Sequence, residues 1–408
     1  MKKAVLIISI LSLLNVTCMA RASSRYAYNP PEYTNDGFEV GNLDDVDINA
    51  RKVFKTSDGI RRGKYKEVHS LLIYRHGRLV FEEYFTGHRY EWDGPRHHGE
   101  LVDWNRSMPH CTHSVTKSIV SACIGIALDR GFIESVQQSV FDYLPEHRHL
   151  DTNGKDKITI EHLLTMTSGL EWDEWSAPLS SPKNDIVGIW FTENPVTFIL
   201  DRPLVSGPGT RFNYSGGNMI LLGEIIRHAS GMNIDDFSAH YLFEPLGIDS
   251  QYWRLRFENG VFETGGGLDM TPRDMAKIGA TFLGGGVWNG RRIISEQWVE
   301  KSAAAFPGNS GIDIPGEDSG KNYYSYSWWI KTYTRPGREL SMYSASGWGG
   351  QHIMVLPELD TVVVFTGGNF VTRRPPHGIL ENTLYPQWTR LQTKRPHGRR
   401  ALPNTERC

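Results

Sequence analysis

The sequence predicts an α/β (α+β) fold, in which helices flank an antiparallel sheet and an all-helical domain is inserted into the chain. Strand-like runs stand near the start, helical patterns fill the middle, and strands return in the last third. Strands from both ends of a chain can share one sheet if the helical stretch between them is an insertion. The 408 residues, 39% of them hydrophobic, suffice for a large core and exclude a disordered or collagen-like chain.

The first strands form a predicted hairpin. Residues 69–76 and 78–86 are rich in β-branched and aromatic side chains, and they flank Gly77. The segment 113–130 that follows is apolar nearly all round, which is typical of a central, buried helix. Gly131 is a suitable residue to end that helix.

The middle of the chain carries repeated helix signals. Thr159 is a suitable N-cap for one helix, and Thr271-Pro272 opens another with a cap and a proline at the first position. The predicted helices cover 160–167, 217–229, 271–282, a segment that opens at Ser295, and 378–390, while 303–322 is predicted to be a surface loop. The last strands are predicted at 326–332, 351–356 and 361–366.

These elements divide the chain into five parts. The predicted parts are a signal peptide at 1–22, an extended arm at 23–65, a split α/β domain at 66–158 and 268–393, a helical insertion domain at 159–267, and a disordered tail at 394–408.

The N-terminus has the pattern of an export signal. Met1-Lys2-Lys3 precedes a mainly apolar run over 4–14, and Ala20-Arg21-Ala22 offers a small-residue cleavage site. The run is too short to span a bilayer. We therefore expect an exported, periplasmic or secreted protein without a membrane span. Lipidation of Cys18 is the weaker alternative, because Asn15 stands where an aliphatic residue is expected.

Charge and composition limit the classes of partner and cofactor that the sequence predicts. The formal net charge of −2 argues against nucleic acid. His97-His98 and His147-Arg148-His149 lack a Cys or carboxylate array at ligand spacing, so we predict no metal and no cofactor. Removal of 1–22 leaves Cys111, Cys123 and Cys408, and an odd number argues against a full disulfide framework. Cys111 and Cys123 are predicted to be small buried apolar residues rather than nucleophiles.

Ser114 and Lys117 are the strongest catalytic candidates. Their spacing of three places both side chains on one face at the start of the buried helix. Serine needs an adjacent base to become a nucleophile, and a buried lysine at a helix N-terminus has a lowered pKa that suits this role. A second Ser-x-x-Lys copy ends at Lys183, but Pro182 disfavours a helical Ser–Lys face there.

Two further segments can complete such a site. Tyr214 stands just before a helix and can transfer a proton if a cation lowers its pKa, although alone it is more typical of a core aromatic. Ser346-Gly347-Trp348 leads toward an apolar strand, where glycine allows the backbone close to a ligand. The backbone N–H groups of Ser114 and Trp348 are then candidate oxyanion-hole donors.

The order of these motifs resembles the serine β-lactamase and penicillin-binding-protein superfamily. It is most similar to class C-type β-lactamases, DD-peptidases and related esterases, and the segments 69–85 and 347–351 resemble the branch with 6-aminohexanoate-dimer hydrolases and carboxylesterases. The resemblance covers roughly 65–388 and is supported by segments at 158–170, 208–212, 265–268 and 271–276. It implies a β-lactamase/transpeptidase-like fold and a metal-free acyl-enzyme, with Ser114 as nucleophile, Lys117 as base and Tyr214 as proton shuttle.

Two departures from that family bear on the substrate. Ala345 stands where β-lactamases and peptidases commonly carry a lysine that pairs with a substrate carboxylate. Gly216 stands where they carry an asparagine, and Asn218 comes two residues late. These changes leave the hydrolytic residues in place and favour an ester or amide substrate of lower charge. Trp172, Glu174, Ser346 and Gly347 are the candidate substrate contacts.

The function predicted is therefore that of a serine hydrolase for a small ester, amide or lactam. The first alternative is a β-lactamase or DD-peptidase acting on β-lactams or peptidoglycan peptides. The second is a silent ligand-binding or sensor protein of the same fold, against which the complete set of Ser114, Lys117 and Tyr214 counts.

Overall fold

The computed structural model describes residues 28–179, 181–307, 309, 312, 321–335, 338–371 and 376–384. The predicted signal peptide at 1–22, the predicted tail at 394–408, Cys18 and Cys408 lie outside the described residues.

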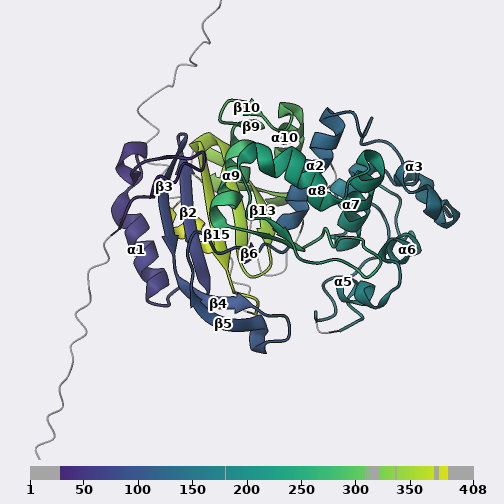
Figure 1. Cartoon of the computed structure of the whole chain (residues 1–408), viewed down its shortest axis with the longest axis horizontal. Helices are drawn as coiled ribbons and strands as arrows, with labels where there is room; N and C mark the ends of the chain where they lie inside the picture. The colour runs from purple at the N-terminus through teal and green to yellow at the C-terminus, as the bar shows by residue number, and fades with distance from the viewer. Residues whose placement is uncertain are drawn as a thin grey trace, which may run out of the picture.

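An eight-stranded sheet forms the centre of the fold (Figure 1). The sequence predicts an antiparallel sheet that joins early and late strands, but it does not predict β1 or the long strand β13. Its order is β1 (Glu39–Val40), β3 (Arg78–Tyr84), β2 (Val68–Arg75), β15 (Thr361–Gly367), β14 (Gln351–Leu356), β13 (Arg338–Gly347), β12 (Trp328–Arg335) and β11 (Lys321–Ser325). All neighbours are antiparallel except β1 and β3. The pairing of β15 with β2 joins the late strands to the early hairpin, so the helical stretch between them is an excursion from one sheet.

The hairpin of β2 and β3 turns at two residues with left-handed backbone. His76 has φ 51° and Gly77 has φ 78°. Positive φ at both central residues is the geometry that suits the right-handed twist of the flanking strands. The turn therefore fixes the register of the two strands that begin the sheet.

Helices cover one face of the sheet. α2 (Val115–Asp129) contacts β13 and β14, while α9 (Pro272–Leu283) lies across β2, β14 and β15. α10 (Glu296–Ala303) packs against β11, β12 and β13. α2 is buried along almost its whole length, which agrees with its lack of a polar face.

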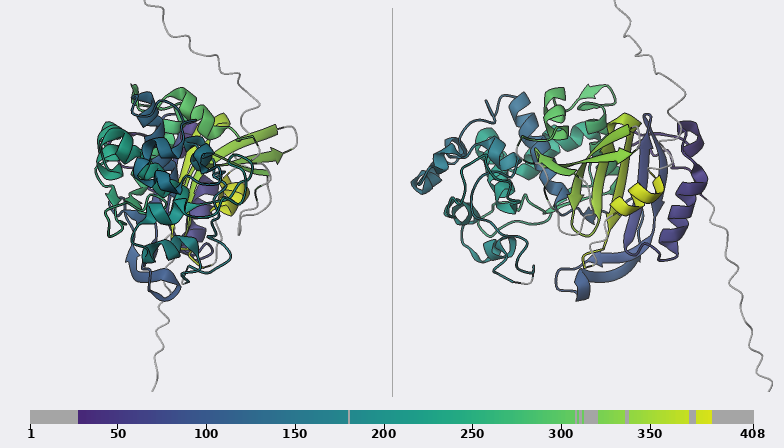
Figure 2. Two further views of the ribbon diagram at one scale, coloured as in Figure 1. Left: turned by 90° about the vertical axis from the view of Figure 1, so that its right-hand side faces the viewer. Right: turned by 180° about the vertical axis from the view of Figure 1, so that it is seen from behind.

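The helical stretch gathers at one end of the sheet (Figures 1 and 2). It contains α3 (Val140–Tyr143), α4 (Ile160–Leu164), α5 (Asp185–Gly188), α6 (Pro195–Leu200), α7 (Gly216–Ser230) and α8 (Ile234–Ser238). α7 contacts α2 and four of these helices, and it ends at Gly231 with φ 74°. A small sheet of β6 (His110–Cys111), β8 (Leu268–Met270) and β7 (Tyr252–Trp253) connects this stretch to the rest. The exact domain boundaries stay a prediction.

The segment predicted as an extended arm is not extended throughout. It contains β1, a short 3-10 helix at Leu43–Val46 and the helix α1 (Ala50–Arg61). Val53, Ser57 and Ile60 recur at helical spacing and are buried against the second face of the sheet. The many Asn, Asp and Gly residues around α1 concealed that periodicity. Figure 2 shows α1 at the outer side of the sheet, opposite the helical stretch.

A second hairpin extends from the early strands. It consists of β4 (Thr86–Tyr90) and β5 (His98–Asp103), neither of which is predicted from the sequence. In the described part of the chain, no helix combines the length and hydrophobicity that crossing a bilayer needs.

Candidate active site

Ser114 lies between β6 and the first turn of α2. The backbone reaches it through His113, which has the left-handed φ of 46°, an uncommon value for a residue with a side chain. The Thr112 hydroxyl donates to Leu268 O at 2.7 Å and fixes the chain just before this turn. Ser114 occupies the N-cap position, yet its hydroxyl makes no capping hydrogen bond, so its oxygen is available for chemistry.

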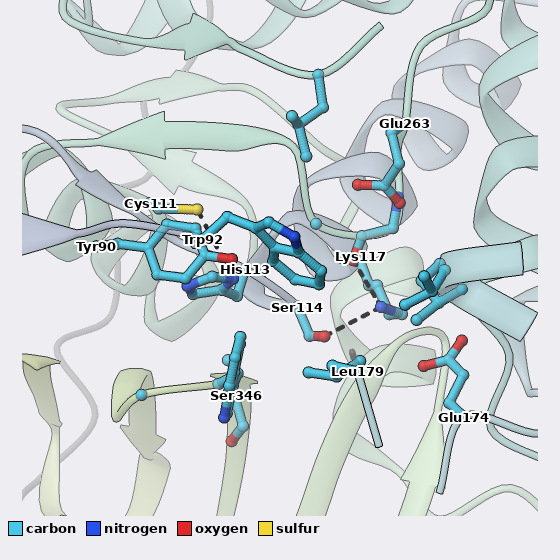
Figure 3. Close-up of a pocket in the computed structure, with 18 of the residues that line it drawn as sticks. Tyr90, Trp92, Cys111, His113, Ser114, Lys117, Glu174, Leu179, Glu263 and Ser346 are labelled. Atoms are coloured by element: carbon cyan, nitrogen blue, oxygen red, sulfur yellow. Dashed lines mark hydrogen bonds between the residues drawn. The ribbon is translucent and has the colours of Figure 1, made fainter. Parts of the chain in front are cut away.

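Lys117 is held beside that oxygen (Figure 3). Its Nζ lies 3.1 Å from Ser114 Oγ and donates a hydrogen bond to Gly265 O at 2.6 Å. The side chain is buried, and burial lowers the pKa of the ammonium, while the carboxyl groups of Glu174 and Glu263 oppose that shift. The net direction favours the neutral amine that a general base requires.

Tyr214 completes the cluster from the start of α7. Lys117 Nζ lies 4.9 Å from the centre of the Tyr214 ring, and the ring stacks on Trp329 at 5.6 Å. Burial and the nearby Glu174 raise the pKa of the phenol, which a hydrogen bond with Ser114 opposes. The sequence reasoning considered a lowered pKa, and the direction found is the reverse. Tyr214 is therefore protonated at neutral pH and can act as a proton donor.

Gly347 allows β13 to approach the helix N-terminus. A Cβ atom at this position would lie 2.2 Å from Thr112 O and 3.3 Å from Ser114 N. Only glycine tolerates so close an approach, because real Cβ contacts do not fall below 3.0 Å. Trp348 follows directly, and its indole Nε1 donates to Phe370 O at 2.9 Å, which fixes the loop that carries its backbone N–H. The two candidate oxyanion donors, Ser114 N and Trp348 N, thus belong to adjoining backbone segments.

Of the two candidate substrate contacts Glu174 and Trp172, only Glu174 reaches the cavity. Glu174 lines the cavity near Lys117, whereas Trp172 does not line it. Trp172 Nε1 donates to Glu174 Oε1 at 2.7 Å, and the backbone N–H of Gly216 donates to the same oxygen. Burial raises the pKa of Glu174, and Lys117 opposes that shift. Trp172 is therefore a support for Glu174 rather than a wall of the cavity.

Ser346 and Gly347 both line the cavity, but Ala345 does not. Ser346 Oγ lies 3.1 Å from His352 Nδ1 on the adjacent strand β14. The Ala345 side chain is fully buried in the core. A buried methyl group thus stands where β-lactamases and peptidases commonly carry a lysine, while Arg254 lines the cavity from another segment.

The cavity around Ser114 has a volume of about 590 Å³ and is mainly apolar. Its aromatic walls are Tyr90, Trp92, Trp175, Trp190, Phe191, Tyr214, Trp329 and Trp348. Cys111 also lines it, and burial raises the pKa of that thiol to about 11, so it is not a thiolate at neutral pH.

Sequence reasoning missed several cavity residues. Arg254, Glu263 and His352 line the cavity, and Tyr90 and Trp92 reach it from the β4–β5 hairpin. Glu263 had a usable signal in the sequence, because it stands just before the Gly265–Gly267 run. In the structure, Gly265 N donates a hydrogen bond to Glu263 Oε1 at 2.9 Å. Arg254 had none: its position depends on the pairing of β7 with β8, where its Nε lies 3.4 Å from Asp269 Oδ1.

Sequence comparisons identify relatives of this chain. The 6-aminohexanoate-dimer hydrolase of Paenarthrobacter ureafaciens is 28% identical over 264 residues, which cover 62% of this chain and 65% of that protein. Esterase EstB of Burkholderia gladioli is 31% identical over 144 residues, which cover 33% of this chain and 36% of that protein. The chain thus spans less than two thirds of the length of these curated relatives.

Solved structures share the fold. A family VIII carboxylesterase has a TM-score of 0.62 at 17% identity, covering 83% of this chain and 97% of that one. The octameric penicillin-binding protein homologue from Pyrococcus abyssi has a TM-score of 0.60 at 22% identity, and the match covers 84% of this chain and 78% of that one. These likenesses confirm the β-lactamase/transpeptidase-like fold.

The relatives by sequence and by fold are esterases, amide hydrolases and penicillin-binding-protein-like proteins of the serine hydrolase superfamily. The family model described as Beta-lactamase matches residues 68–379, which is more than half of the chain. The resemblance seen in the motifs is confirmed, and the chain belongs to the Beta-lactamase family.

Proposed function

We propose that the protein is a serine hydrolase that cleaves ester or amide bonds through an acyl group on Ser114. The observation that carries this proposal is the 3.1 Å separation of Lys117 Nζ and Ser114 Oγ inside a buried site. A neutral Lys117 amine can donate one hydrogen to Gly265 O while its lone pair accepts the Ser114 hydroxyl proton.

Acylation begins when Ser114 Oγ bonds to the substrate carbonyl carbon and its proton passes to Lys117. The backbone N–H groups of Ser114 and Trp348 would stabilise the negative charge that develops on the carbonyl oxygen. The bond to the leaving group then breaks, and the protonated Tyr214 is suited to supply the proton that the leaving alkoxide or amine needs. In this scheme the cationic Lys117, whose Nζ lies 4.9 Å from the centre of the Tyr214 ring, then returns a proton to the Tyr214 oxygen.

Deacylation runs the same proton path in reverse. Water adds to the acyl carbon as it gives a proton to the Tyr214 hydroxyl, which passes its own proton to the neutral amine of Lys117. The bond from carbon to Ser114 Oγ then breaks, and Lys117 gives the proton to Ser114 Oγ. The scheme needs only the side chains and backbone groups of the chain itself.

The cavity supports a substrate with apolar groups. Aromatic side chains form most of its walls, and the lysine that pairs with a carboxylate in β-lactamases and peptidases is replaced by the buried Ala345. We therefore favour uncharged esters and linear amides over β-lactams and peptidoglycan peptides.

A substrate panel tests this preference. The panel contains a short-chain p-nitrophenyl ester, a linear amide dimer and the β-lactam nitrocefin. We expect the ester and the linear amide to be hydrolysed with a higher kcat/KM than nitrocefin. Ser114→Ala protein supplies the background rate. Faster turnover of nitrocefin, or a stable penicillin adduct, would favour the β-lactamase or peptidase alternative. No turnover of any of the three would favour the silent binding protein.

A further inference from the structure

A cluster of metal-ligating side chains lies outside the cavity. Glu67, His88 and His98 each offer one ligand atom, and these atoms all lie within 4.8 Å of one another. It is the one such group found among the described residues, and none of its three members lines the cavity. The reaction proposed for Ser114 makes no use of it.

The chain brings these residues together from three segments. Glu67 directly precedes β2, His88 lies on β4, and His98 begins β5. The pairing of β4 with β5 shifts between His88 and Tyr90, where Tyr90 pairs with His98. Bulges of this kind redirect side chains, and the His88 and His98 rings lie parallel with their centres 4.5 Å apart.

Hydrogen bonds already orient the candidate ligand atoms. Glu67 Oε1 lies 2.8 Å from His88 Nδ1, and the other carboxylate oxygen lies 3.2 Å from His69 Nε2. His98 Nε2 lies 2.8 Å from Gly368 O, so it carries the hydrogen and leaves the Nδ1 lone pair to bind a cation. A carbonyl or carboxylate on the far ring nitrogen is the usual companion of a metal-binding histidine.

The surrounding backbone leaves room for this arrangement. A Cβ at Gly368 would lie 2.9 Å from both Glu67 Oε2 and His69 Nε2, and a Cβ at Gly87 would lie 2.3 Å from the His69 ring. His69 is 1% exposed, and its Nδ1 has no hydrogen-bond partner within the described ranges. Two glycines and a buried imidazole thus enclose the carboxylate of Glu67.

In contrast to the absence of a metal predicted from the sequence, we propose that Glu67, His88 and His98 bind one Zn²⁺ ion, with His69 orienting the Glu67 carboxylate. Two imidazoles and a carboxylate are a ligand set that zinc prefers, and tetrahedral zinc places its ligand atoms about 3.4 Å apart. To close the 4.8 Å spread, the 32% exposed His88 side chain must turn out of its parallel stack on His98, so that both ring nitrogens face one ion. Water completes the fourth position.

Zinc at this site would connect the β4–β5 hairpin to the start of β2 in the central sheet. Binding replaces the proton shared between Glu67 and His88, so the ion takes over a contact that already links β4 to the start of β2. The same hairpin carries Tyr90 and Trp92 into the cavity. In this proposal the ion stabilises the β4–β5 hairpin, and its loss should lower the unfolding temperature without removing the Ser114 site.

The test is calorimetric titration of untagged, chelator-treated protein with ZnCl2. We expect saturable binding of one ion, a higher unfolding temperature with zinc, and no such rise with MgCl2. His88→Ala and His98→Ala should each weaken binding at least about a hundredfold. His76→Ala is the matched control, because His76 forms a separate pair with Asp360 at 2.9 Å, and it should bind zinc as the wild type does.

X-ray absorption of the zinc-loaded wild type gives a readout that needs no variant. Two imidazole nitrogens with the remaining ligands oxygen are expected. Absence of saturable binding, unchanged affinity in both histidine variants, equal loss in His76→Ala, or sulfur ligation to the zinc would each overturn the proposal.

Discussion

Replacing Lys117 with alanine is expected to lower kcat/KM for a p-nitrophenyl ester by about 10³-fold while the fold survives. A positioned general base contributes about 10²- to 10⁴-fold, and Lys117 Nζ is the nitrogen held 3.1 Å from Ser114 Oγ. The base must be neutral, so the wild-type kcat/KM should rise with pH through the pKa of Lys117. Burial lowers that pKa, which places this rise below the pH at which an exposed lysine loses its proton. The rise should be missing from the pH profile of the variant.

Lys183→Ala is the matched control for this prediction. Lys183 ends the second Ser-x-x-Lys copy, and its side chain is exposed. Its removal should leave kcat/KM within about twofold of the wild type, as is usual for exposed positions without special contacts. The account of Lys117 fails if Lys117→Ala, with unchanged circular dichroism, keeps more than about a tenth of the wild-type rate.

Gly347→Ala is expected to lower kcat by about 10²-fold or more. The added Cβ would lie 2.2 Å from Thr112 O, and backbone on both sides of the contact must then separate. That movement takes the N–H of Trp348 away from Ser114, and the loss of one oxyanion donor costs about 10²- to 10³-fold in kcat. Steady-state kinetics should show the effect mainly in kcat, because the donor acts chiefly in the transition state.

Gly207→Ala is the control for the added methyl group. Its Cβ would meet nothing closer than Thr210 Cγ2 at 3.4 Å, which is an ordinary contact. We expect wild-type kcat from this variant. Full activity of Gly347→Ala would show that the close approach of β13 to the helix N-terminus is not needed for catalysis.

Local patterns made much of the fold predictable. The apolar run that became α2, the caps at Thr159 and Thr271, and the turn at Gly77 each depend on residues close in sequence. Ser114 and Lys117 meet for the same reason, since a spacing of three within one helix fixes their geometry.

The remaining features depend on contacts between distant segments. Helix α1 was concealed by its polar surroundings and is buried only because the sheet offers it a face. The pKa of Tyr214 rises because several elements bury its ring, and the residues next to Tyr214 in sequence do not reveal this burial. Arg254 reaches the cavity through strand pairing, and His88 and His98 approach through a bulge. Unlike α1, the placements of Tyr214, Arg254, His88 and His98 leave no periodic signal in the sequence.

Labelling with a fluorophosphonate probe tests the central claim, that Ser114 is the acylated nucleophile, most directly. The probe bonds irreversibly to an activated serine, so peptide mass spectrometry can locate it however fast an ester intermediate would turn over. We predict one adduct, on the peptide that contains Ser114, with loss of ester hydrolysis in proportion to labelling and no adduct in Ser114→Ala. An unmodified Ser114 in protein that still hydrolyses the ester would contradict the account.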